Sequence, residues 1–488
     1  MTLDQLIPGA PAIEVTGLTA DSRKIAPGFV FAALQGVAVD GRNFIDKAIS
    51  QGAVAILTDE RPDDREGQWS VPVIRTAEPR HTLALAAAAF YQRQPETMVA
   101  ITGTNGKSSS VDFLRQIWRH CGLSAASMGT LGVITPNGAV DLGHTTPDPV
   151  SIQSTLAILA NEGVTHCAME ASSHGLAQYR LHGVKLAAGA FTNLTQDHLD
   201  YHKDFEDYRN AKLKLFSELL PTGAPAVINA DSPEREIVEK VALKAGLKPF
   251  TFGWKGDHLW IDEITPRATG QELRLQWETP EGDKETIVQL PLIGEFQALN
   301  ALAAAGLALS LGADAEAVFA AMATLKGVKG RLELVGDTDE GAGVFVDYAH
   351  TPDGLATLLR AVRPHAAGRV ICVFGCGGDR DPFKRPMMGE IAQKFADEII
   401  VTDDNPRSED PASIRKAIIE ACAGAEEIGD REAAIRAGVA RLKKGDALVI
   451  AGKGHETGQI IKGETHPFSD HDVAQQALAD RKAGRLHV

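Results

Sequence analysis

The stretch that decides the fold of this chain is VAITGTNGKSSS, residues 99–110. An apolar run ends in a short segment with two glycines, which Lys107 and three serines follow. Gly103 and Gly106 allow backbone N–H groups to turn inward without a Cβ clash. A helix that begins near Lys107 directs its N-terminal dipole at a bound anion. The stretch therefore predicts a phosphate-binding loop between a strand and a helix.

This loop is shorter than the general P-loop. The general pattern has four residues between its first glycine and the Gly-Lys pair, whereas only Thr104 and Asn105 stand there in this chain. Lys107 supplies charge for the outer phosphates, and the hydroxyl of Ser108 can ligate Mg²⁺. The alternative is a glycine-rich turn with an exposed lysine. The strand before the loop and the helix after it favour phosphate binding.

Composition limits the classes of protein to consider. A chain of 488 residues predicts about three domains. It is 44% hydrophobic and 23% charged, as is typical of soluble globular proteins. The net charge of −15 argues against nucleic-acid binding, which depends on a basic surface. The five cysteines form no paired metal knuckles, which is typical of reduced thiols.

Neither targeting nor membrane insertion is predicted. The start of the chain, MTLDQLIPGA, lacks the basic-then-apolar pattern of a secretory signal. The longest apolar run, residues 83–90, is far too short to cross a bilayer. We therefore expect a cytoplasmic monomer with no membrane insertion.

Three regions differ in their sequence texture. We place their boundaries at residues 1–94, 95–329 and 330–488. The first mixes short strand-like runs with turns and ends in an alanine-rich helix. The second and third alternate apolar strands with helices, which predicts mostly parallel sheets covered by helices. In such sheets ligands bind beyond the C-terminal ends of the strands.

Two polar features of the second region could carry chemistry. Glu170 ends a predicted strand beside the phosphate loop and suits a metal ligand, although an isolated carboxylate is more often a cap or an ion pair. The stretch at residues 193–216 contains Asp197, His198, Asp200 and His202 and then Lys212. These residues could help bind a second Mg²⁺. A polar loop followed by a solvated helix lysine is equally compatible with the composition.

The third region places polar motifs after successive predicted strands. These are VDYAHTPD, FGCGGDRDPFKRP, TDDNPRSED and AGKGHE. Any one of them could be a surface loop, but four at strand ends indicate a binding face. Arginine suits a carboxylate ligand because its planar fork binds it bidentately. The motifs bring to one rim Arg380, Arg385, Arg407, Lys453 and Glu456.

Together the motifs resemble the Mur ligases, ATP-dependent amino-acid ligases of peptidoglycan precursor synthesis. The resemblance rests on TGTNGKSS, MEASSHGL, TNLTQDHLDYH, AKLKLF, FQALNALAA, KGVKGRLE, VDYAHTPDGL, FGCGGDRD and AGKGHE, in family order. Residues 18–41 are similar to the family's uridine-nucleotide-binding domain. The pattern is most similar to the third ligase, which extends UDP-N-acetylmuramoyl-L-alanyl-D-glutamate. DNPR at residues 404–407 resembles the form that selects meso-2,6-diaminopimelate over lysine.

The resemblance implies a three-domain α/β fold. It consists of a small N-terminal uridine-nucleotide-binding domain, a central P-loop-type ATPase domain with a mostly parallel sheet, and a C-terminal Rossmann-like domain. It also implies ATP and Mg²⁺ as cofactors, and amide formation through an acyl phosphate. Lys107, Lys212 and His198 would be catalytic, with Lys212 carbamylated to N6-carboxylysine.

The resemblance further implies four sets of binding residues. ATP would be held, between the second and third domains, by Gly103, Thr104, Asn105, Gly106, Lys107, Ser108, Ser109, Asn300, Arg331 and Asp347. Mg²⁺ would be held by Ser108, Glu170, His198 and the carbamate of Lys212. The UDP-substrate would contact Ala20, Ser22, Thr145, Thr146, Ser172, Gln178 and Arg180. Diaminopimelate would contact Arg380, Asp404, Asn405, Pro406, Arg407, Gly452 and Glu456.

The chain departs from the family at residues 37–39, where Val-Ala-Val replaces residues that are often polar in relatives. Uridine contacts there would be made by backbone or apolar groups. Three rival functions remain at this stage: folylpolyglutamate synthetase, a lysine-adding ligase, and a nucleotide-binding switch or transport ATPase that uses the phosphate loop alone. The uridine-domain pattern and DNPR argue against the first, and DNPR alone argues against the second. A purely structural protein fits the charged strand-end motifs least.

Overall fold

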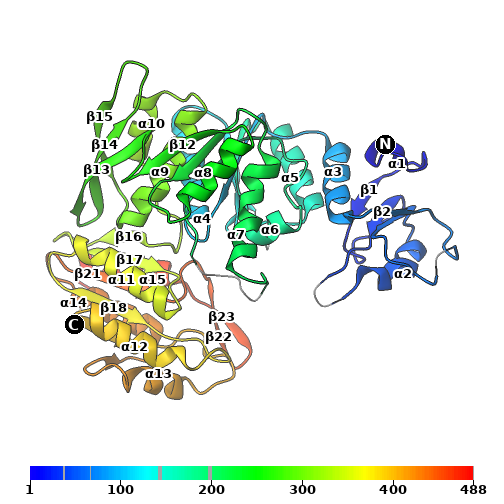
Figure 1. Ribbon diagram of the computed structural model, residues 1–488. Coiled ribbons are helices and arrows are strands. Elements are labelled where there is room, and N and C mark those ends of the chain that lie inside the picture. Colours follow the sequence, from blue (N-terminus) through cyan, green and yellow to red (C-terminus); the bar gives the residue numbers. More distant parts are fainter. Residues whose placement is uncertain (37–38, 66, 141–144, 196–200, 487–488) are drawn as a thin grey trace. The chain divides into compact units, whose positions relative to one another are not determined.

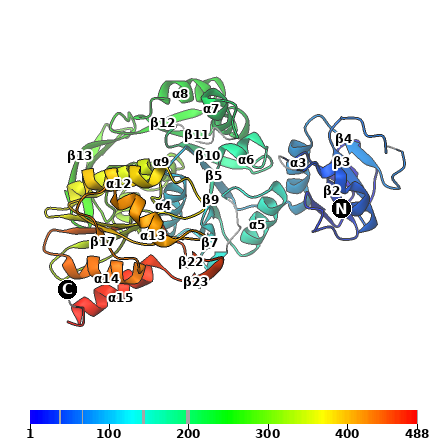
Figure 2. The same ribbon diagram turned by 90° about the horizontal axis from the view of Figure 1, so that it is seen from below.

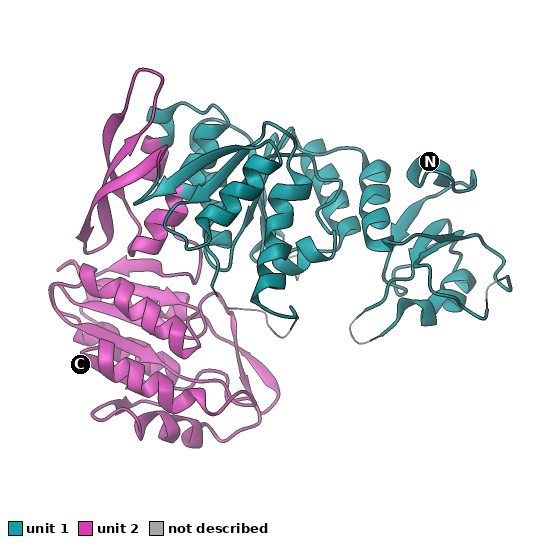
Figure 3. Ribbon diagram, in the orientation of Figure 1, with its two compact units in different colours: residues 1–256, 303–318 teal, residues 257–302, 319–488 magenta. Residues whose placement is uncertain are grey.

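The computed structural model describes residues 1–36, 39–65, 67–140, 145–195 and 201–486. The chain divides into two compact units, coloured separately in Figure 3. Unit 1 comprises Met1–Gly256 and Ala303–Val318, and unit 2 comprises Asp257–Leu302 and Phe319–Val488. The three-domain boundaries at residues 94 and 329 stay a prediction. The α/β class is confirmed in both units.

Unit 1 begins with a small parallel sheet of strand order β1-β2-β3-β4 (Figure 2). Alternate residues of β2 point to opposite faces. Val30 packs with α3 on one face, and Phe31 packs with α2 on the other. The elements are α1 Leu3–Leu6, β1 Gly17–Thr19, β2 Phe29–Ala32, η1 Gly41–Phe44, α2 Ile45–Ser50, β3 Ala55–Thr58, β4 Val73–Arg75 and α3 Pro79–Tyr91.

The rest of unit 1 is built on a larger sheet in which β12-β11-β10-β5-β9-β6 run parallel and β7 and β8 add an antiparallel edge (Figure 2, with β12 also labelled in Figure 1). The predicted strand before the phosphate loop is β5, at its centre, and the predicted helix after it is α4. The elements are β5 Thr97–Thr102, α4 Lys107–His120, β6 Ala125–Gly129, β7 Gly132–Thr135, β8 Gly138–Val140, α5 Pro149–Asn161, β9 His166–Glu170, α6 Ser173–Ala177, β10 Leu186–Phe191, α7 Phe205–Lys214, η2 Leu215–Leu219, β11 Pro225–Asn229, α8 Arg235–Lys244 and β12 Lys248–Gly253.

Unit 2 contains an antiparallel group of strands and a second α/β sheet. The antiparallel strands are β13 Leu259–Arg267, β14 Gly270–Trp277 and β15 Lys284–Leu290. Two helices follow, α9 Glu295–Ser310, which continues into unit 1, and α10 Ala315–Met322. The α/β sheet has the order β16-β17-β21-β18-β19-β20, in which all neighbours are parallel except the β16–β17 pair.

Helices cover both faces of this second sheet. Leu355, Met388 and Ile414 anchor α11, α12 and α13 on one face, whereas Ile435 and Leu478 anchor α14 and α15 on the other. The elements are β16 Glu333–Asp337, β17 Gly343–Asp347, α11 Pro352–Val362, η3 Arg363–His365, β18 Val370–Phe374, α12 Lys384–Phe395, β19 Glu398–Val401, α13 Pro411–Ile419, β20 Glu426–Glu427, α14 Arg431–Arg441, β21 Ala447–Ala451, β22 Gly458–Ile461, β23 Glu464–Pro467 and α15 Asp470–Lys482. Across the described part of the chain, no helix has the length and apolarity needed to span a membrane.

A buried ion pair joins the first residues of α14 and α15, which pack side by side (Figure 2). The side chains of Arg431 and Asp470 are fully buried, and two guanidinium nitrogens donate to the two carboxylate oxygens at 2.7 Å each. Arg431 also donates to the carbonyls of Asp403 and Ala451, the latter being the last residue of β21. Because the side chain of each residue is fully buried and forms an ion pair with the other, removing Arg431 leaves the buried Asp470 carboxylate without its cation.

We therefore predict that Arg431→Met lowers the free energy of unfolding by about 3–5 kcal/mol, the range measured when one partner of a buried pair is removed. Urea denaturation followed by circular dichroism measures this change. Arg436→Met is the matched control, because Arg436 pairs with Asp480 in a partly exposed position and such pairs contribute about 0–1 kcal/mol. Equal stability of Arg431→Met and Arg436→Met would contradict the prediction.

Candidate active site

The phosphate loop in unit 1 has the conformation that its glycines predict. Gly103 has φ +150°, and Gly106, the residue before α4, has φ +86°. A Cβ on Gly103 would lie 2.0 Å from Thr192 Oγ1, so only glycine fits. The Thr104 and Asn105 N–H groups donate to the backbone and side-chain oxygens of Asn193, both at 2.9 Å. The residues after β10 thus hold the loop in place.

Two lysines meet at this loop. Lys107 Nζ donates to the carbonyls of Gly103 and Thr104 at 2.9 and 2.8 Å. Lys212, on α7, is 2% exposed, and its Nζ donates to the same Gly103 carbonyl at 2.7 Å. Its ammonium lies 4.6 Å from the ring centre of Tyr208, whose hydroxyl is 3.0 Å from Thr104 Oγ1. The alternative of a solvated helix lysine is therefore wrong for Lys212.

A carboxylate and hydroxyls gather beside the start of α4. Glu170, the last residue of β9, is 1% exposed, and its Oε1 accepts from Ser108 Oγ and from the Thr130 N–H, each at 2.8 Å. Thr130 Oγ1 is 3.0 Å from Thr145 Oγ1. Gly129 lets this carboxylate approach, because a Cβ there would lie 2.1 Å from Glu170 Oε1. Buried carboxylate and hydroxyl oxygens are the ligands that Mg²⁺ prefers, so this donor set fits the ion.

The remaining predicted metal ligand cannot be placed. His198, together with Asp197 and Asp200, lies outside the described residues. His202 is described and is buried, with Nδ1 3.1 Å from Asp207 Oδ2. Among the residues that the structure describes, no three His, Cys, Asp or Glu side chains form a cluster suited to a metal. Ser108, Glu170 and Lys212 therefore remain as the described candidates.

The residues predicted to bind the UDP-substrate lie partly together. Arg180 donates to the Thr146 carbonyl and, at 2.8 Å, to Gln178 Oε1. Thr146 Oγ1 in turn donates to the Glu170 carbonyl at 3.1 Å and accepts from the Ser172 N–H at 3.2 Å. This group therefore adjoins the Glu170 site through Thr145 and Thr146. Ala20 and Ser22 follow β1 on the smaller sheet, and two of the three divergent positions, 37 and 38, lie outside the described residues.

The predicted nucleotide residues of unit 2 form a connected chain. Asn300 Nδ2 donates to Gln297 Oε1 at 3.1 Å, and Gln297 Nε2 donates to the Arg331 carbonyl at 3.2 Å. Asp347, at the end of β17, accepts from the N–H groups of Leu332 and Ala349 at 2.6 and 2.7 Å. Burial raises the pKa of Asp347 despite these hydrogen bonds. Unit 2 thus brings Asn300, Arg331 and Asp347 together.

The predicted amino-acid residues of unit 2 gather at the ends of β18, β19 and β21. Arg407 Nη1 donates to the Gly378 carbonyl at 2.8 Å, and its backbone, at φ +52°, is pinned by hydrogen bonds with Ile460 and Lys462. A Cβ on Gly378 would lie 2.0 Å from the Pro406 carbonyl oxygen. Only glycine therefore fits at position 378, in the loop after β18. A Cβ on neighbouring Gly377 would lie 2.7 Å from Arg407 Nη1 and 3.8 Å from Arg380 Cγ.

The two carboxylates of this group differ in their surroundings. Asp404 is 8% exposed, and its Oδ2 has no hydrogen-bond partner among the described residues. A Cβ on Gly452 would lie 2.6 Å from that oxygen. Glu456 Oε2 accepts from Asn405 Nδ2 at 2.9 Å and from Lys453 Nζ at 3.0 Å. Burial acts to raise the pKa of Glu456, but the hydrogen bonds from Asn405 and Lys453 outweigh it and hold that pKa below its usual value.

Sequence reasoning assigned no role to several residues of these groups. Two of them, Thr192 and Asn193, follow β10, which pairs with β5, and Thr130 follows β6, which is separated from β5 by β9. The signal that could have found them is a polar residue directly after a buried strand. Lys453 was placed on the rim of the third region, but nothing in AGKGHE distinguishes a buried ammonium from an exposed one.

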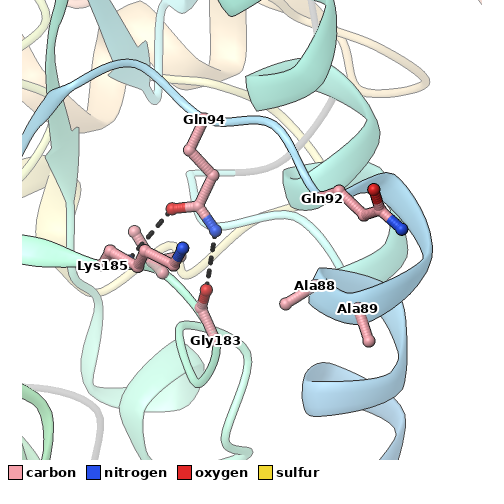
Figure 4. Close-up of a pocket in the computed structure, with 7 residues that line it drawn as sticks. Ala88, Ala89, Gln92, Gln94, Gly183 and Lys185 are labelled. Carbon is pink, nitrogen blue, oxygen red and sulfur yellow. Dashed lines mark hydrogen bonds between the residues drawn. The ribbon is translucent and has the colours of Figure 1, made fainter. Parts of the chain in front are cut away.

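Unit 1 has a surface pocket whose lining residues differ from those of the predicted sites. It is lined by Ala88, Ala89, Gln92, Gln94 and residues 183–185 (Figure 4). Gln94 Nε2 donates to the Gly183 carbonyl at 2.7 Å, and its Oε1 accepts from the Lys185 N–H at 3.0 Å. None of the predicted site residues lines this pocket. Gln94 therefore holds the segment between α3 and β5 against residues 183–185, and we assign it no role in ligand binding.

Comparison with known proteins places the chain in a family. Models described as "Mur ligase family, catalytic domain", "Mur ligase middle domain" and "Mur ligase, glutamate ligase domain" match residues 14–91, 101–308 and 330–454. A curated protein of Chelativorans sp. (strain BNC1) named UDP-N-acetylmuramoyl-L-alanyl-D-glutamate--2,6-diaminopimelate ligase is 55% identical over 96% of both chains.

Two further relatives carry the same name. The protein of Brucella melitensis biotype 1 is 52% identical over 98% of this chain and 97% of its own. A solved structure with this name has a TM-score of 0.78 and 32% identity, and the alignment covers 99% of each chain. These matches extend over nearly all of the sequence and include each region that carries a predicted motif, and we conclude that the chain belongs to the Mur ligase family.

Proposed function

We propose that this protein is an ATP-dependent ligase that joins meso-2,6-diaminopimelate to the D-glutamate carboxylate of UDP-N-acetylmuramoyl-L-alanyl-D-glutamate. The observation that carries the proposal is the group at the strand ends of unit 2, where Asp404 and Arg407 lie in the loop after β19 and Asn405 of that loop donates to Glu456. A phosphate loop by itself supports nucleotide binding only. An arginine and two carboxylates in one group supply complementary charge for a ligand with both an ammonium and a carboxylate group. The named relatives, at 50–55% identity, support the same function.

The reaction proceeds in two steps. The substrate carboxylate attacks the γ-phosphorus of ATP, and the bond to the β-phosphate oxygen breaks, giving an acyl phosphate and ADP. A neutral amine of diaminopimelate then attacks the acyl carbon, an amide forms, and inorganic phosphate leaves with the amine's proton going to solvent. Such chemistry depends mainly on positioning and on neutralising charge.

The phosphate loop supplies much of that neutralisation. The N–H groups at the start of α4 and the ammonium of Lys107, which lies at the loop, would neutralise the phosphates of bound ATP, so that two negatively charged groups can approach each other. Asn300, Arg331 and Asp347 contribute to binding the rest of ATP. Ser108 and Glu170 would hold Mg²⁺, which supplies Lewis-acid stabilisation of phosphate charge when bound.

The surroundings of Lys212 support the proposal that it is carbamylated. The unmodified ammonium shares the Gly103 carbonyl with the ammonium of Lys107, and two like charges this close disfavour each other. Adding CO₂ to the Lys212 amine turns this like-charge pair into an opposite-charge pair. The resulting carbamate gives the site a further oxygen ligand for Mg²⁺. Thr145, Thr146, Ser172, Gln178 and Arg180 adjoin Glu170 and are proposed to bind the UDP-substrate, with Ala20 and Ser22 of the smaller sheet.

Diaminopimelate is distinguished from lysine by a second ammonium–carboxylate centre. Arg407 and Arg380 suit its carboxylate, and Asp404 and Glu456 suit its ammonium. Lysine would leave an arginine fork without its carboxylate, and sites built for polar pairing reject ligands that leave them unpaired.

The proposed function predicts substrate-dependent phosphate release. Purified protein with ATP, Mg²⁺ and the UDP-muramoyl dipeptide should release phosphate rapidly with meso-diaminopimelate and far more slowly with lysine. Omitting the amino acid is the control. Phosphate release that ignores the amino acid would instead support a switch or transport ATPase, and equal rates would support a lysine-adding ligase.

Replacing Arg407 should damage amino-acid recognition rather than nucleotide binding. We expect Arg407→Ala to raise the KM for diaminopimelate about 10–100-fold, because a charge-assisted hydrogen bond contributes about 1.5–3 kcal/mol. The KM for ATP should change less than about twofold, since no proposed ATP ligand contacts the arginine side chain. The control is Arg23→Ala, because Arg23 is an exposed arginine that follows β1 and belongs to no proposed amino-acid or ATP site. Unchanged amino-acid kinetics in Arg407→Ala would exclude the assignment.

Replacing Lys212 tests the carbamate. We expect Lys212→Ala to lose activity and to regain part of it when a short carboxylate such as acetate or formate is added, because the small anion can occupy the place of the carbamate. Lys244→Ala, at the exposed end of α8, should keep wild-type activity and show no response to carboxylate. Full activity of Lys212→Ala without additive rules out the carbamate.

A further inference from the structure

We propose that Lys453 is a positioning residue that fixes the carboxylate of Glu456 and thereby sets the preference for diaminopimelate over lysine. The inference rests on the proposed function, because it concerns how the amino-acid group of unit 2 selects its ligand. It adds to that function a residue that would not itself touch the ligand.

The backbone forces the side chain of Lys453 inward. The residue follows β21 and stands between Gly452 at φ +120° and Gly454 at φ +55°, two conformations that favour glycine. A Cβ on Gly454 would lie 2.7 Å from Tyr348 Cβ, and one on Gly452 would lie 2.6 Å from Asp404 Oδ2. The chain is thus packed closely on both sides of Lys453, whose side chain is 0% exposed.

The buried ammonium completes a triangle of polar groups. Lys453 Nζ donates to Asn405 Oδ1 at 3.1 Å and to Glu456 Oε2 at 3.0 Å, while Asn405 Nδ2 donates to the same Glu456 oxygen at 2.9 Å. Asn405 Oδ1 also accepts from the Ile460 N–H at 3.0 Å, which fixes the orientation of its amide. Oε2 of Glu456 is therefore committed to two donors, and Oε1 stands outside the triangle. Lys453 and Asn405 thus hold the carboxylate through one of its two oxygens.

Charge explains why a lysine rather than a neutral donor stands here. Glu456 is partly exposed, with 33% of its side chain accessible, and lies in the same group as the guanidinium of Arg407. Without Lys453 and Asn405 this carboxylate would not be held in one orientation, and any pairing of it with a neighbouring cation would compete with the ligand's distal centre. An ammonium buried behind the carboxylate keeps it ionised and held back.

The ligand then meets separated charges. Arg407 then serves the distal carboxylate, and Glu456, whose Oε2 alone is used by Lys453 and Asn405, serves the distal ammonium. Because lysine lacks the distal carboxylate, losing the separation affects diaminopimelate more than lysine. Lys453 consequently influences selectivity through Glu456.

The test is a double-mutant cycle on the full-length enzyme with Lys453→Met, Glu456→Gln and the double variant. Lys453→Met should raise the KM for meso-diaminopimelate at least tenfold, leave the KM for ATP within twofold, and lower the ratio of kcat/KM for diaminopimelate to that for lysine. If Lys453 acts through Glu456, the double variant should bind diaminopimelate no more weakly than Glu456→Gln alone. Lys443→Met, an exposed lysine just before β21, should match the wild type.

A purely structural lysine would give a different result. Melting temperatures are measured for every variant, and Lys453→Gln, which keeps a neutral donor, is tested in parallel with Lys453→Met. If both variants lose fold, or if their KM values for ATP and diaminopimelate rise together, Lys453 is structural and the proposal is overturned. Additive effects of Lys453→Met and Glu456→Gln would overturn it as well. A wild-type enzyme that does not use diaminopimelate would instead contradict the proposed function.

Discussion

The close approach of the chain at Gly103 is the constraint on which the rest of unit 1 depends. The loop passes so near Thr192 that no side chain fits at Gly103, and the carbonyl of this residue accepts from both Lys107 and Lys212. A loop held this closely must be fixed from outside, and Asn193 after β10 does so by binding two of its N–H groups. The central position of β5 in the sheet makes this possible, because its neighbours end at the same edge.

The same principle organises unit 2. Loops after β18, β19 and β21 meet at one edge, and glycines in the loops after β18 and β21 lie too close to the loop after β19 for a Cβ. Gly378 makes room for the Pro406 carbonyl, and Gly452 makes room for Asp404. The glycines of FGCGGDRD are therefore explained by contacts between loops, and those of AGKGHE by such contacts together with a positive φ. Binding groups from three strands converge because the residues between them are small.

Local pattern was sufficient for the elements around the phosphate loop, but it did not predict the antiparallel strands β13, β14 and β15. The predicted strands at residues 97–102 and 165–170 are β5 and β9, and Lys107 begins α4, since apolar runs and a glycine–lysine boundary are local signals. Burial of Lys212 and Lys453 was not predictable in this way, because it depends on which strand ends meet. The partners of Glu170 illustrate the same limit: Thr130 lies 40 residues away and follows another strand. The position of His198 lies outside the described residues, so its role stays a prediction.

Each unit contains buried cations, and the same physical rule applies to all of them. Lys212, Lys453 and Arg431 are each almost fully inaccessible in a chain whose net charge is −15. Burying such a charge is unfavourable unless oxygens surround it, and strand ends supply them: the Gly103 carbonyl for Lys212, the Ala451 carbonyl and Asp470 for Arg431, and Asn405 with Glu456 for Lys453. Arg431 has its charge matched by a carboxylate that it binds at both oxygens, so it belongs to the scaffold. Lys453 binds only one oxygen of its carboxylate and leaves the other for a ligand. Lys212 donates to the Gly103 carbonyl, which Lys107 also contacts, so a change in the charge of the Lys212 side chain acts directly on the phosphate loop.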